Sequence, residues 1–342
     1  MNILVTIPEN SVRERLVPPP MARRLDGLGD VTWNDSTDQL EPDELRTLLA
    51  GIDVCVTGWG TTTLTADVLT DADRLGLVAH VGGSVASIAS DELYDRGIPV
   101  TSANDVMARY VAEGILAFTL ASLRRVSWFD RELAAGAWPR DHGRTASLYG
   151  STIGFVGLGT VGGYLLDLLH PFDVSVLVYD PYVEPDRLEA YPFADLASLE
   201  ETLSRADVVS IQAAKTRETI HLVDADGLAS MRDGALLINA ARGSIVDEEA
   251  LCDELERGRL RAHLDVFEAE PLPESSPLRE FDRAVLTPHV AASPVRHRLT
   301  EAVIEEIERF QRGEPLEGAV PREVYERMTL DSLSAADKSA SN

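Results

Sequence analysis

The sequence predicts an α/β protein made of two doubly wound, parallel-sheet domains. Three observations lead to this prediction. Short apolar runs alternate with helix-like stretches along the first part of the chain, and a second, stronger alternation starts near Thr152. A glycine-rich turn lies between the first strand and the first helix of that second series. The chain has 342 residues, 44% of them apolar, which is enough for two compact cores.

The first series of apolar runs occupies the N-terminal part of the chain. Its predicted strands are residues 3–7, 54–57, 77–81 and 99–102, with helix-like stretches at 43–49 and 67–69 between them. Strands that alternate with helices pair in parallel, because each crossover returns the chain to the same edge of the sheet. Residues 110–123 follow as a long apolar helix without an internal proline.

The second series contains six apolar runs, at residues 152–156, 174–179, 208–211, 235–239, 261–266 and 284–286. Six strands in this rhythm predict a complete doubly wound, Rossmann-like domain. Residues 299–310 then predict a helix with one buried stripe, which we expect to pack on the first domain. The small and polar residues 331–342 are expected to be disordered.

The charge balance of the chain is strongly acidic. Asp and Glu total 57 against 31 for Lys and Arg, which gives a net charge of −26 and argues against a nucleic-acid partner. The only lysines are Lys215 and Lys338. Such a surface is typical of a halophilic protein in a salt-rich cytoplasm, where ions screen the self-repulsion. A GC-rich genome also explains the few lysines, but not the excess of carboxylates.

Other features narrow the class of protein further. The apolar stretches considered, such as residues 236–241, are too short to cross a bilayer, and the N-terminus lacks the pattern of a secretory signal, so we expect a cytoplasmic protein without a membrane span. Cys55 and Cys252 are far apart and are expected to be core thiols. No metal site is predicted, because His80, His142 and His221 lack the spacing of metal ligands.

The glycine-rich turn follows the first strand of the second series and opens a helix. It contains Gly157, Gly159 and Gly162, with Thr160 and Val161 before the last glycine. The first glycine permits the tight turn, the second lets the backbone approach a pyrophosphate, and the third lets helix and strand pack closely. The free N–H groups of the helix N-terminus then face the anion. This pattern predicts a dinucleotide site.

Asp180 closes the next predicted strand, where a carboxylate can accept hydrogen bonds from both ribose hydroxyls. The same carboxylate would repel a 2′-phosphate. Pro181 and Tyr182 follow it, and neither supplies the arginine that NADP binding usually requires. The predicted cofactor is therefore NAD.

Three polar residues follow in segments near the ends of later strands. They are Arg242 in residues 239–247, Glu270 in residues 265–271 and His289 in residues 287–293. Each alone is typical of a surface or structural residue. Because they occur in this order after a dinucleotide motif, the combination resembles the D-2-hydroxyacid dehydrogenase family over residues 1 to about 325.

The resemblance makes His289 the general acid and base, Glu270 its carboxylate partner and Arg242 the guanidinium that binds the substrate. The chemistry agrees, because reduction of a 2-oxo acid needs a proton at the developing alkoxide and histidine titrates near neutrality. A nearby glutamate favours the imidazolium, and an arginine stabilises the growing negative charge. The implied activity is hydride transfer between NAD(H) and a small 2-hydroxy or 2-oxo acid.

The resemblance also implies which residues contact the ligands. Further cofactor contacts are expected from Ala213, Thr219, Ala240, Ala241, Arg242 and Asp265. The backbone of Gly83, Ser84 and Val85 is expected to bind the substrate carboxylate, together with Arg242. Two departures from the family pattern occur. The acidic and amide side chains that are frequent in the family at the loop of residues 82–87 are absent. The His-x-Pro motif that is frequent after the fourth strand of the cofactor domain is replaced by Gln-Ala-Ala at residues 212–214.

The domain boundaries follow from the same resemblance. A discontinuous substrate domain is expected at residues 1–104 and 290–330, and an NAD-binding domain at 105–289. The active site is expected in the cleft between the two domains. Members of the family usually form dimers and act on the D isomer, so a homodimer is expected as well.

Several residues have alternative interpretations. Glu268 lies two residues from Glu270, but the glutamate of the family immediately precedes a proline. Asp265 is equally compatible with a turn or helix-capping residue. Trp59 either faces the substrate or packs against its own loop.

Alternatives also exist for the whole protein. A 3-phosphoglycerate dehydrogenase would need several cations near the phosphate, for which Arg109, Arg296 and Arg298 are candidates. An NAD-sensing, corepressor-like protein without turnover would be expected to lack part of the Arg, Glu and His set. Since all three residues are present, a reductase for glyoxylate, hydroxypyruvate or another short 2-oxo acid is favoured.

Overall fold

The computed structural model divides the chain into two compact units and describes all residues except 141–144, 293–295, 331–332 and 334–342. Unit 1 contains Met1–Ala108 and Ser293–Ser332, and unit 2 contains Arg109–Ala292 and Leu333–Asn342. Apart from Leu333, the tail predicted to be disordered lies outside the described residues, and so does His142.

Unit 1 is built on a parallel sheet of five strands in the order β2-β1-β3-β4-β5. The strands are β1 (Asn2–Val5), β2 (Asp30–Trp33), β3 (Val54–Thr57), β4 (Leu77–His80) and β5 (Val100–Ser102). Four of them were predicted. The edge strand β2 was missed because its residues alternate between exposed and half-buried and form no continuous apolar run.

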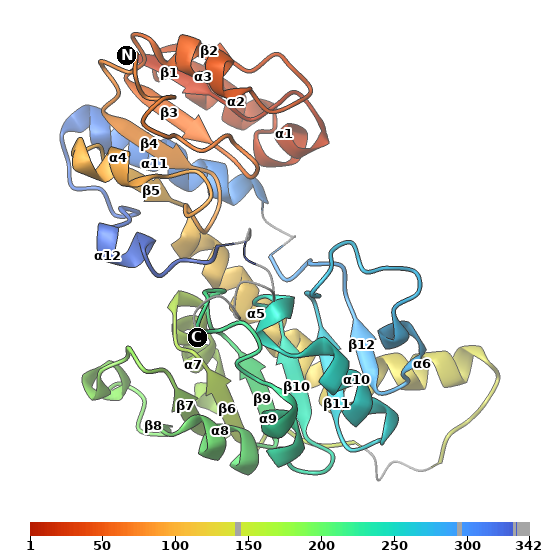
Figure 1. The fold of residues 1–342 in the computed structure, drawn as a ribbon. Coiled ribbons are helices and arrows are strands. Elements are labelled where there is room, and N and C mark those ends of the chain that lie inside the picture. Colours follow the sequence, from red (N-terminus) through yellow and green to blue (C-terminus); the bar gives the residue numbers. More distant parts are fainter. Residues whose placement is uncertain (141–144, 293–295, 331–332, 334–342) are drawn as a thin grey trace. The chain divides into compact units, whose positions relative to one another are not determined.

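Helices cover both faces of this sheet (Figure 1). They are α1 (Ser11–Leu16), α2 (Pro19–Asp26), α3 (Pro42–Leu49), α4 (Asp91–Asp95), α11 (Arg296–Arg312) and α12 (Arg322–Tyr325). Ile3 and Val5 belong to one core with α1, α2 and α11, whereas Leu4 belongs to a second core with α3 and α4. This alternation follows from the two-residue period of a strand. The predicted return of the C-terminal helix to the first domain is thereby confirmed, but residues 67–69 form a turn rather than a helix.

Unit 2 is built on a parallel sheet of seven strands in the order β12-β11-β10-β9-β6-β7-β8. The strands are β6 (Thr152–Val156), β7 (Ser175–Tyr179), β8 (Ala194–Leu196), β9 (Val208–Ile211), β10 (Leu236–Asn239), β11 (Arg261–Leu264) and β12 (Ala284–Leu286). Six were predicted, and the short edge strand β8 was missed. The strand order reverses at β6, which lies between β7 and β9, and this is the switch point at which such sheets bind ligands.

The helices of unit 2 complete the doubly wound arrangement. They are α6 (Val126–Ala134), α7 (Thr160–Leu169), α8 (Leu199–Arg205), α9 (Ala225–Ser230) and α10 (Glu248–Glu256), with 3₁₀ turns η1 (His170–Phe172), η2 (Pro185–Leu188), η3 (Gly243–Ile245) and η4 (Pro277–Glu280). Phe155 of β6 belongs to a core that includes α7, while Val156 belongs to a core that includes α8 and α10. The fold class predicted from the sequence is confirmed.

Helix α5 (Asn104–Leu123) corrects one sequence interpretation. Among the described residues it is one helix of 20 residues whose mean hydropathy of 1.4 would allow it to cross a membrane by length and composition alone. The short apolar stretches considered for a membrane span did not include this helix, which was predicted separately at residues 110–123. Its apolar residues serve two cores: Val106 and Met107 pack on a core of unit 1, and Ala112 and Ile115 lie in a core of unit 2.

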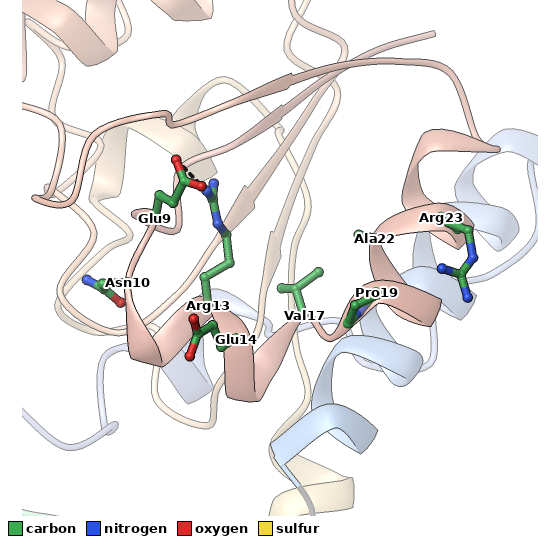
Figure 2. A pocket seen from close by; sticks show the side chains of 8 residues that line it. All are labelled: Glu9, Asn10, Arg13, Glu14, Val17, Pro19, Ala22 and Arg23. Carbon is green, nitrogen blue, oxygen red and sulfur yellow. Dashed lines mark ion pairs between the residues drawn. The ribbon is translucent and has the colours of Figure 1, made fainter.

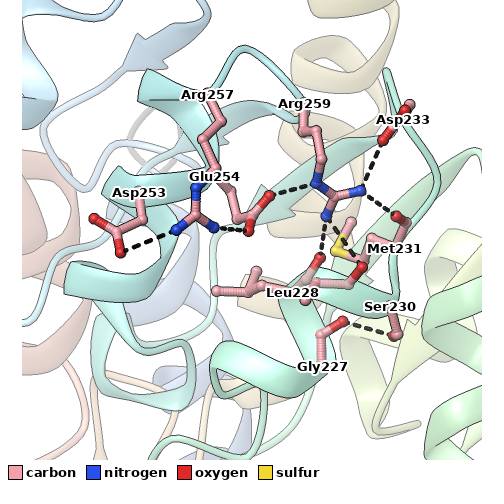
Figure 3. Close-up of polar contacts among 10 residues, drawn as sticks. Gly227, Leu228, Ser230, Met231, Asp233, Asp253, Glu254, Arg257 and Arg259 are labelled. Atoms are coloured by element: carbon pink, nitrogen blue, oxygen red, sulfur yellow. Dashed lines mark hydrogen bonds and ion pairs between the residues drawn. The ribbon is translucent and has the colours of Figure 1, made fainter.

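A network centred on Arg259 ties α9 and α10 to the turn before β11 (Figure 3). The guanidinium donates to Glu254 at 2.5 Å and to Asp233 at 2.8 Å, and also to the carbonyls of Leu228, Ala229 and Met231 at the end of α9. Glu254 is only 4% exposed. One side chain thus satisfies the last carbonyls of a helix and a buried carboxylate.

Replacement of Arg259 by methionine is expected to lower the free energy of unfolding by about 2–4 kcal/mol, because the helix carbonyls and Glu254 lose a charged donor. Urea denaturation measures this change. Arg257→Met is the matched control, since Arg257 also contacts Glu254 but is 63% exposed, and we expect a change below about 1 kcal/mol. Equal effects of the two substitutions would contradict the prediction.

Candidate active site

The glycine-rich turn lies at the carboxyl end of β6, at the switch point of the sheet. Gly157 has a φ of +95°, and a Cβ at this position would lie 2.6 Å from the backbone of Ala213, so only glycine fits. Helix α7 begins after Gly159, which makes no side-chain cap and faces open space. No acidic residue occurs in the first turn of α7. The N–H groups there suit an anion such as a pyrophosphate.

Asp180 follows β7 and bonds to the glycine-rich turn. One carboxylate oxygen accepts from the backbone N–H of Leu158 at 2.8 Å and the other from the N–H of Tyr182 at 2.9 Å. Each oxygen keeps a further lone pair for a ribose hydroxyl. The carboxylate therefore combines two roles, since it holds the turn and faces the region where a nucleotide is expected.

Arg242 lies in the turn that follows β10. The buried side chain of Asn239 shapes this turn, because it donates to the carbonyl of Arg242 at 2.9 Å and accepts from the N–H of Ala241 at 3.1 Å. No role was predicted for Asn239 from the sequence, although asparagine at the end of a strand is typical of such turns. Gly243 then contacts the Phe267–Glu268 peptide so closely that a Cβ would overlap it. The turn with Arg242 is thus packed against the segment that carries Glu270.

Glu270 and His289 form a hydrogen-bonded pair in which Nδ1 of His289 lies 2.8 Å from a carboxylate oxygen. The other oxygen accepts from the N–H of Phe267 at 3.1 Å. Burial raises the pKa of Glu270, but the hydrogen bonds and charges of His289, Phe267 and Arg242 outweigh it, so the net pKa is lowered. An ionised carboxylate only accepts hydrogen bonds, which assigns the hydrogen to Nδ1 and leaves Nε2 for proton exchange.

The backbone at His289 adopts a left-handed conformation with a φ of +53°, which is unusual for a residue other than glycine. Asp265 holds this segment in place. Its carboxylate is 0% exposed and accepts from Thr287 Oγ1 at 2.5 Å and from the N–H groups of Val290 and Ala291 at 2.9 Å. In this structure the carboxylate of Asp265 therefore bonds to the segment that contains His289, a role close to the turn interpretation.

A second His–Glu pair consists of His221 and Glu268. It distinguishes Glu268 from the nearby Glu270, because the two glutamates bond to different histidines. Nε2 of His221 lies 2.7 Å from Glu268, and the carboxylates of Glu268 and Glu248 each accept from the backbone N–H of the other. Burial and the charge of Glu268 raise the pKa of Glu248, opposed by the bond from the Glu268 N–H. Glu268 is thus engaged with His221, whereas Glu270 is engaged with His289.

The remaining predicted cofactor residues lie in the loops that follow β9 and β10 or in the first turn of α7. Ala213 contacts Gly157, and Ala240 and Ala241 follow β10. Gly162 is buried in α7 beside Thr160 and Val161. Thr219 accepts from the N–H of Thr216 at 2.8 Å and donates to the carbonyl of Ala214 at 2.6 Å, so its hydroxyl closes its own loop.

The predicted substrate loop lies in unit 1, directly after β4. The hydroxyl of Ser84 donates to the carbonyl of Thr329 at 3.0 Å, and the N–H of Val85 points at the sulfur of Met328 at 3.5 Å. Sulfur is a weak acceptor, so a carboxylate would be a stronger partner for this N–H. Gly83 lies against Met107 and Asn104 at the start of α5.

A hollow of about 480 Å³ lies elsewhere in unit 1, between α1 and α2 (Figure 2). Its charged side chains are two acids and two arginines, and Glu9 and Arg13 pair with each other at 3.4 Å. No histidine lines it. We therefore do not assign chemistry to this hollow.

Two observations concern metal ions and thiols in the part of the chain that the structure describes. No group of three or more His, Cys, Asp or Glu side chains there is arranged to hold a metal ion. Burial raises the pKa of Cys55 to about 12, which keeps this thiol uncharged at neutral pH.

Comparison with known proteins agrees with this class of dinucleotide-binding fold. Residues 116–291 match the model of the D-isomer-specific 2-hydroxyacid dehydrogenase NAD-binding domain. The chain is 33% identical to a glyoxylate reductase from Thermofilum pendens over 331 residues, which cover 93% of this chain and 96% of the relative. It is 36% identical to a D-3-phosphoglycerate dehydrogenase from Mycobacterium tuberculosis over 84% of this chain and 54% of that protein, so it spans about half the length of this and similar relatives.

Among solved structures, the TT0316 protein from Thermus thermophilus superposes with a TM-score of 0.77 at 31% identity and covers 94% of this chain and 100% of its own. The protein belongs to the D-2-hydroxyacid dehydrogenase family. The resemblance inferred from the sequence motifs is confirmed.

Proposed function

We propose that the protein is an NAD-dependent D-2-hydroxyacid dehydrogenase that acts as a reductase of a small 2-oxo acid. The observation that carries the proposal is the pair of His289 and Glu270, whose carboxylate is also influenced by the charge of Arg242. Bound NADH would supply the hydride. Nε2 of His289 donates the proton to the alkoxide oxygen, and Arg242 binds the carboxylate or keto oxygen of the substrate.

The loops around β6 fit NAD. The turn at residues 157–159 and the start of α7 would hold the pyrophosphate, while Asp180 would hold the ribose. Ala213, Thr219, Ala240 and Ala241 complete the proposed cofactor surface, while Asp265, also expected as a cofactor contact, is fully buried and supports the segment at His289 instead. The backbone of Gly83, Ser84 and Val85 is proposed to bind the substrate carboxylate, which assigns substrate binding to residues 1–104 and 290–330 and cofactor binding to 105–289.

Asp180→Ala is expected to reduce the preference for NADH over NADPH at least tenfold, because the repulsion of a 2′-phosphate and the ribose bonds are both lost. Steady-state kinetics with both cofactors measure the ratio of kcat/KM values. Asp195→Ala, which removes an exposed carboxylate from β8, is the control and should leave the ratio unchanged. An unchanged ratio in Asp180→Ala would contradict the assignment.

The proposed function is tested by NADH and NADPH oxidation with glyoxylate, hydroxypyruvate, other short 2-oxo acids and 3-phosphohydroxypyruvate. Each assay is run at low and at multimolar KCl. Turnover of a 2-oxo acid with NADH supports the proposal. Binding of NADH without turnover of any acid would instead favour an NAD-sensing protein.

A second candidate is a 3-phosphoglycerate dehydrogenase, the activity named for the M. tuberculosis relative. The phosphohydroxypyruvate arm of the assay decides between the two.

We also propose a cytoplasmic homodimer. The net charge of −26 favours a halophilic protein, for which activity should rise with KCl.

A further inference from the structure

An arginine in unit 1 is held over an aromatic ring. The guanidinium carbon of Arg296, at the start of α11, lies 5.6 Å from the ring centre of Trp59, which follows β3. The indole is 40% exposed. This geometry is typical of a cation–π contact, which fixes the guanidinium without neutralising its charge.

Among the residues that the structure describes, no carboxylate forms an ion pair with the guanidinium of Arg296. Most described arginines of unit 1 pair with a carboxylate, as Arg74 does with Asp53 at 2.8 Å. No carboxylate of the described residues lies within 4 Å of the Arg296 guanidinium, in a chain with 57 acidic residues. Burial lowers the pKa of Arg296, and the nearby charge of Arg15 lowers it further. An anion at this place would offset both effects, because it favours the charged form of the guanidinium.

The other two arginines considered as phosphate ligands differ from Arg296. Arg298 lies in the same turn of α11 but forms an ion pair with Glu301 at 2.9 Å. Arg109 lies in unit 2, where its guanidinium is 5.2 Å from the ring centre of Tyr164. Neither shares the surroundings of Arg296.

The Trp59–Arg296 pair adjoins the proposed substrate loop within unit 1. A Cβ on Gly82 would lie 3.1 Å from Nε1 of Trp59 and would overlap Nε2 of His80. Gly82 directly precedes Gly83, the first residue of that loop. The indole therefore links Arg296 to the backbone that we propose for the substrate carboxylate.

His80 does not supply the positive charge at this place. Its ring is 1% exposed, Nδ1 lies 3.0 Å from Thr57 Oγ1, and burial lowers its pKa to about 4, so it is neutral at pH 7. Nε2 is buried without a hydrogen-bond partner in the described structure. A polar group left unpaired beside Gly82 and Trp59 is a second sign that this region is completed by a ligand.

We propose that Arg296, stacked on Trp59, binds a second anionic group of the substrate, a carboxylate or a phosphate distal to the 2-oxo acid group. The inference rests on the proposed function and narrows its substrate class to short 2-oxo acids that carry two anionic groups. Trp59 acts as a positioning residue for the guanidinium.

The test compares substrates of matched length with and without a distal anion. One pair is 2-oxoglutarate and 2-oxopentanoate, and the other is 3-phosphohydroxypyruvate and hydroxypyruvate. The wild type is expected to have a kcat/KM at least tenfold higher for the member of one pair that carries the distal anionic group, which tells carboxylate from phosphate. Arg296→Gln should lose about tenfold to a hundredfold with that member and change little with its counterpart, which carries only the carboxylate of the 2-oxo acid.

Arg298→Gln is the matched control, since it removes a paired arginine from the same helical turn, and it should keep the preference. A preference that persists in Arg296→Gln, or a wild type that favours the members without a distal anionic group, would overturn the proposal.

A binding experiment separates this proposal from the proposed function. Calorimetric titration of 2-oxoglutarate and of 3-phosphoglycerate into protein with NAD⁺ needs no reduction of the 2-oxo acid. Binding that Arg296→Gln weakens at least tenfold, without turnover of any acid, would sink the proposed function but support the anion site. Binding that is equal in the wild type and in Arg296→Gln would reject the anion site.

Discussion

His289→Gln is expected to lower kcat for 2-oxo acid reduction about 100- to 10,000-fold, because glutamine cannot deliver a proton to the developing alkoxide. The affinity for NADH should change less than about twofold, since the proposed cofactor contacts lie in the glycine-rich turn and at Asp180. Single-turnover kinetics and NADH fluorescence titration measure the two quantities separately.

The chain supplies its own control for this experiment. His221 also bonds a glutamate at 2.7 Å and also has a positive φ, of +46°, but it is paired with Glu268. His221→Gln is expected to leave kcat within about threefold of the wild type. If His221→Gln lost as much activity as His289→Gln, or if His289→Gln kept full activity, the assignment of the acid and base would be wrong.

Asp265→Ala is expected to destabilise the protein by about 3–5 kcal/mol and to abolish most activity. The substitution leaves the Thr287 hydroxyl and the N–H groups of Val290 and Ala291 without their acceptor and creates a cavity. The segment at His289 then loses the bonds that maintain its left-handed backbone. Chemical denaturation measures the stability, and kcat measures the second effect.

The control for Asp265 is Asp195→Ala, an exposed aspartate in the edge strand β8, which we expect to change stability by less than about 0.5 kcal/mol. A native-like denaturation midpoint in Asp265→Ala would show that the carboxylate does not hold the loop. Stability that falls while kcat of the folded fraction is retained would separate the structural role of Asp265 from the position of His289.

The sequence predicted the inner strands of both sheets and the edge strands β5 and β12, and missed the edge strands β2 and β8. β6 and β10 are continuous apolar runs because helices cover both of their faces. β2 and β8 contain exposed residues, so their pattern resembles that of a loop. The helix predicted at residues 110–123 corresponds to α5, which begins earlier, at Asn104, and whose apolar residues pack in two cores.

For the site, the family resemblance predicted Glu270 as the partner of His289, but the partner of Glu268 was not predicted. Local spacing cannot tell that Glu268 bonds His221 while Glu270 bonds His289, because these histidines lie in segments far from the glutamates in sequence. The preference for Glu270 came from the proline that follows it. The contacts of Asn239 and Asp265 were also beyond prediction, since both depend on how a strand end meets the next loop.

The bond between Asp180 and the N–H of Leu158 has a consequence for how cofactor preference can evolve in this chain. A lineage that moved toward NADP by losing the carboxylate would at once release the turn that must receive the pyrophosphate. Asparagine or serine at position 180 keeps an acceptor for that N–H while it removes the negative charge. The accessible mutational path to NADP therefore passes through a neutral acceptor at this position, and an arginine nearby becomes useful only afterwards.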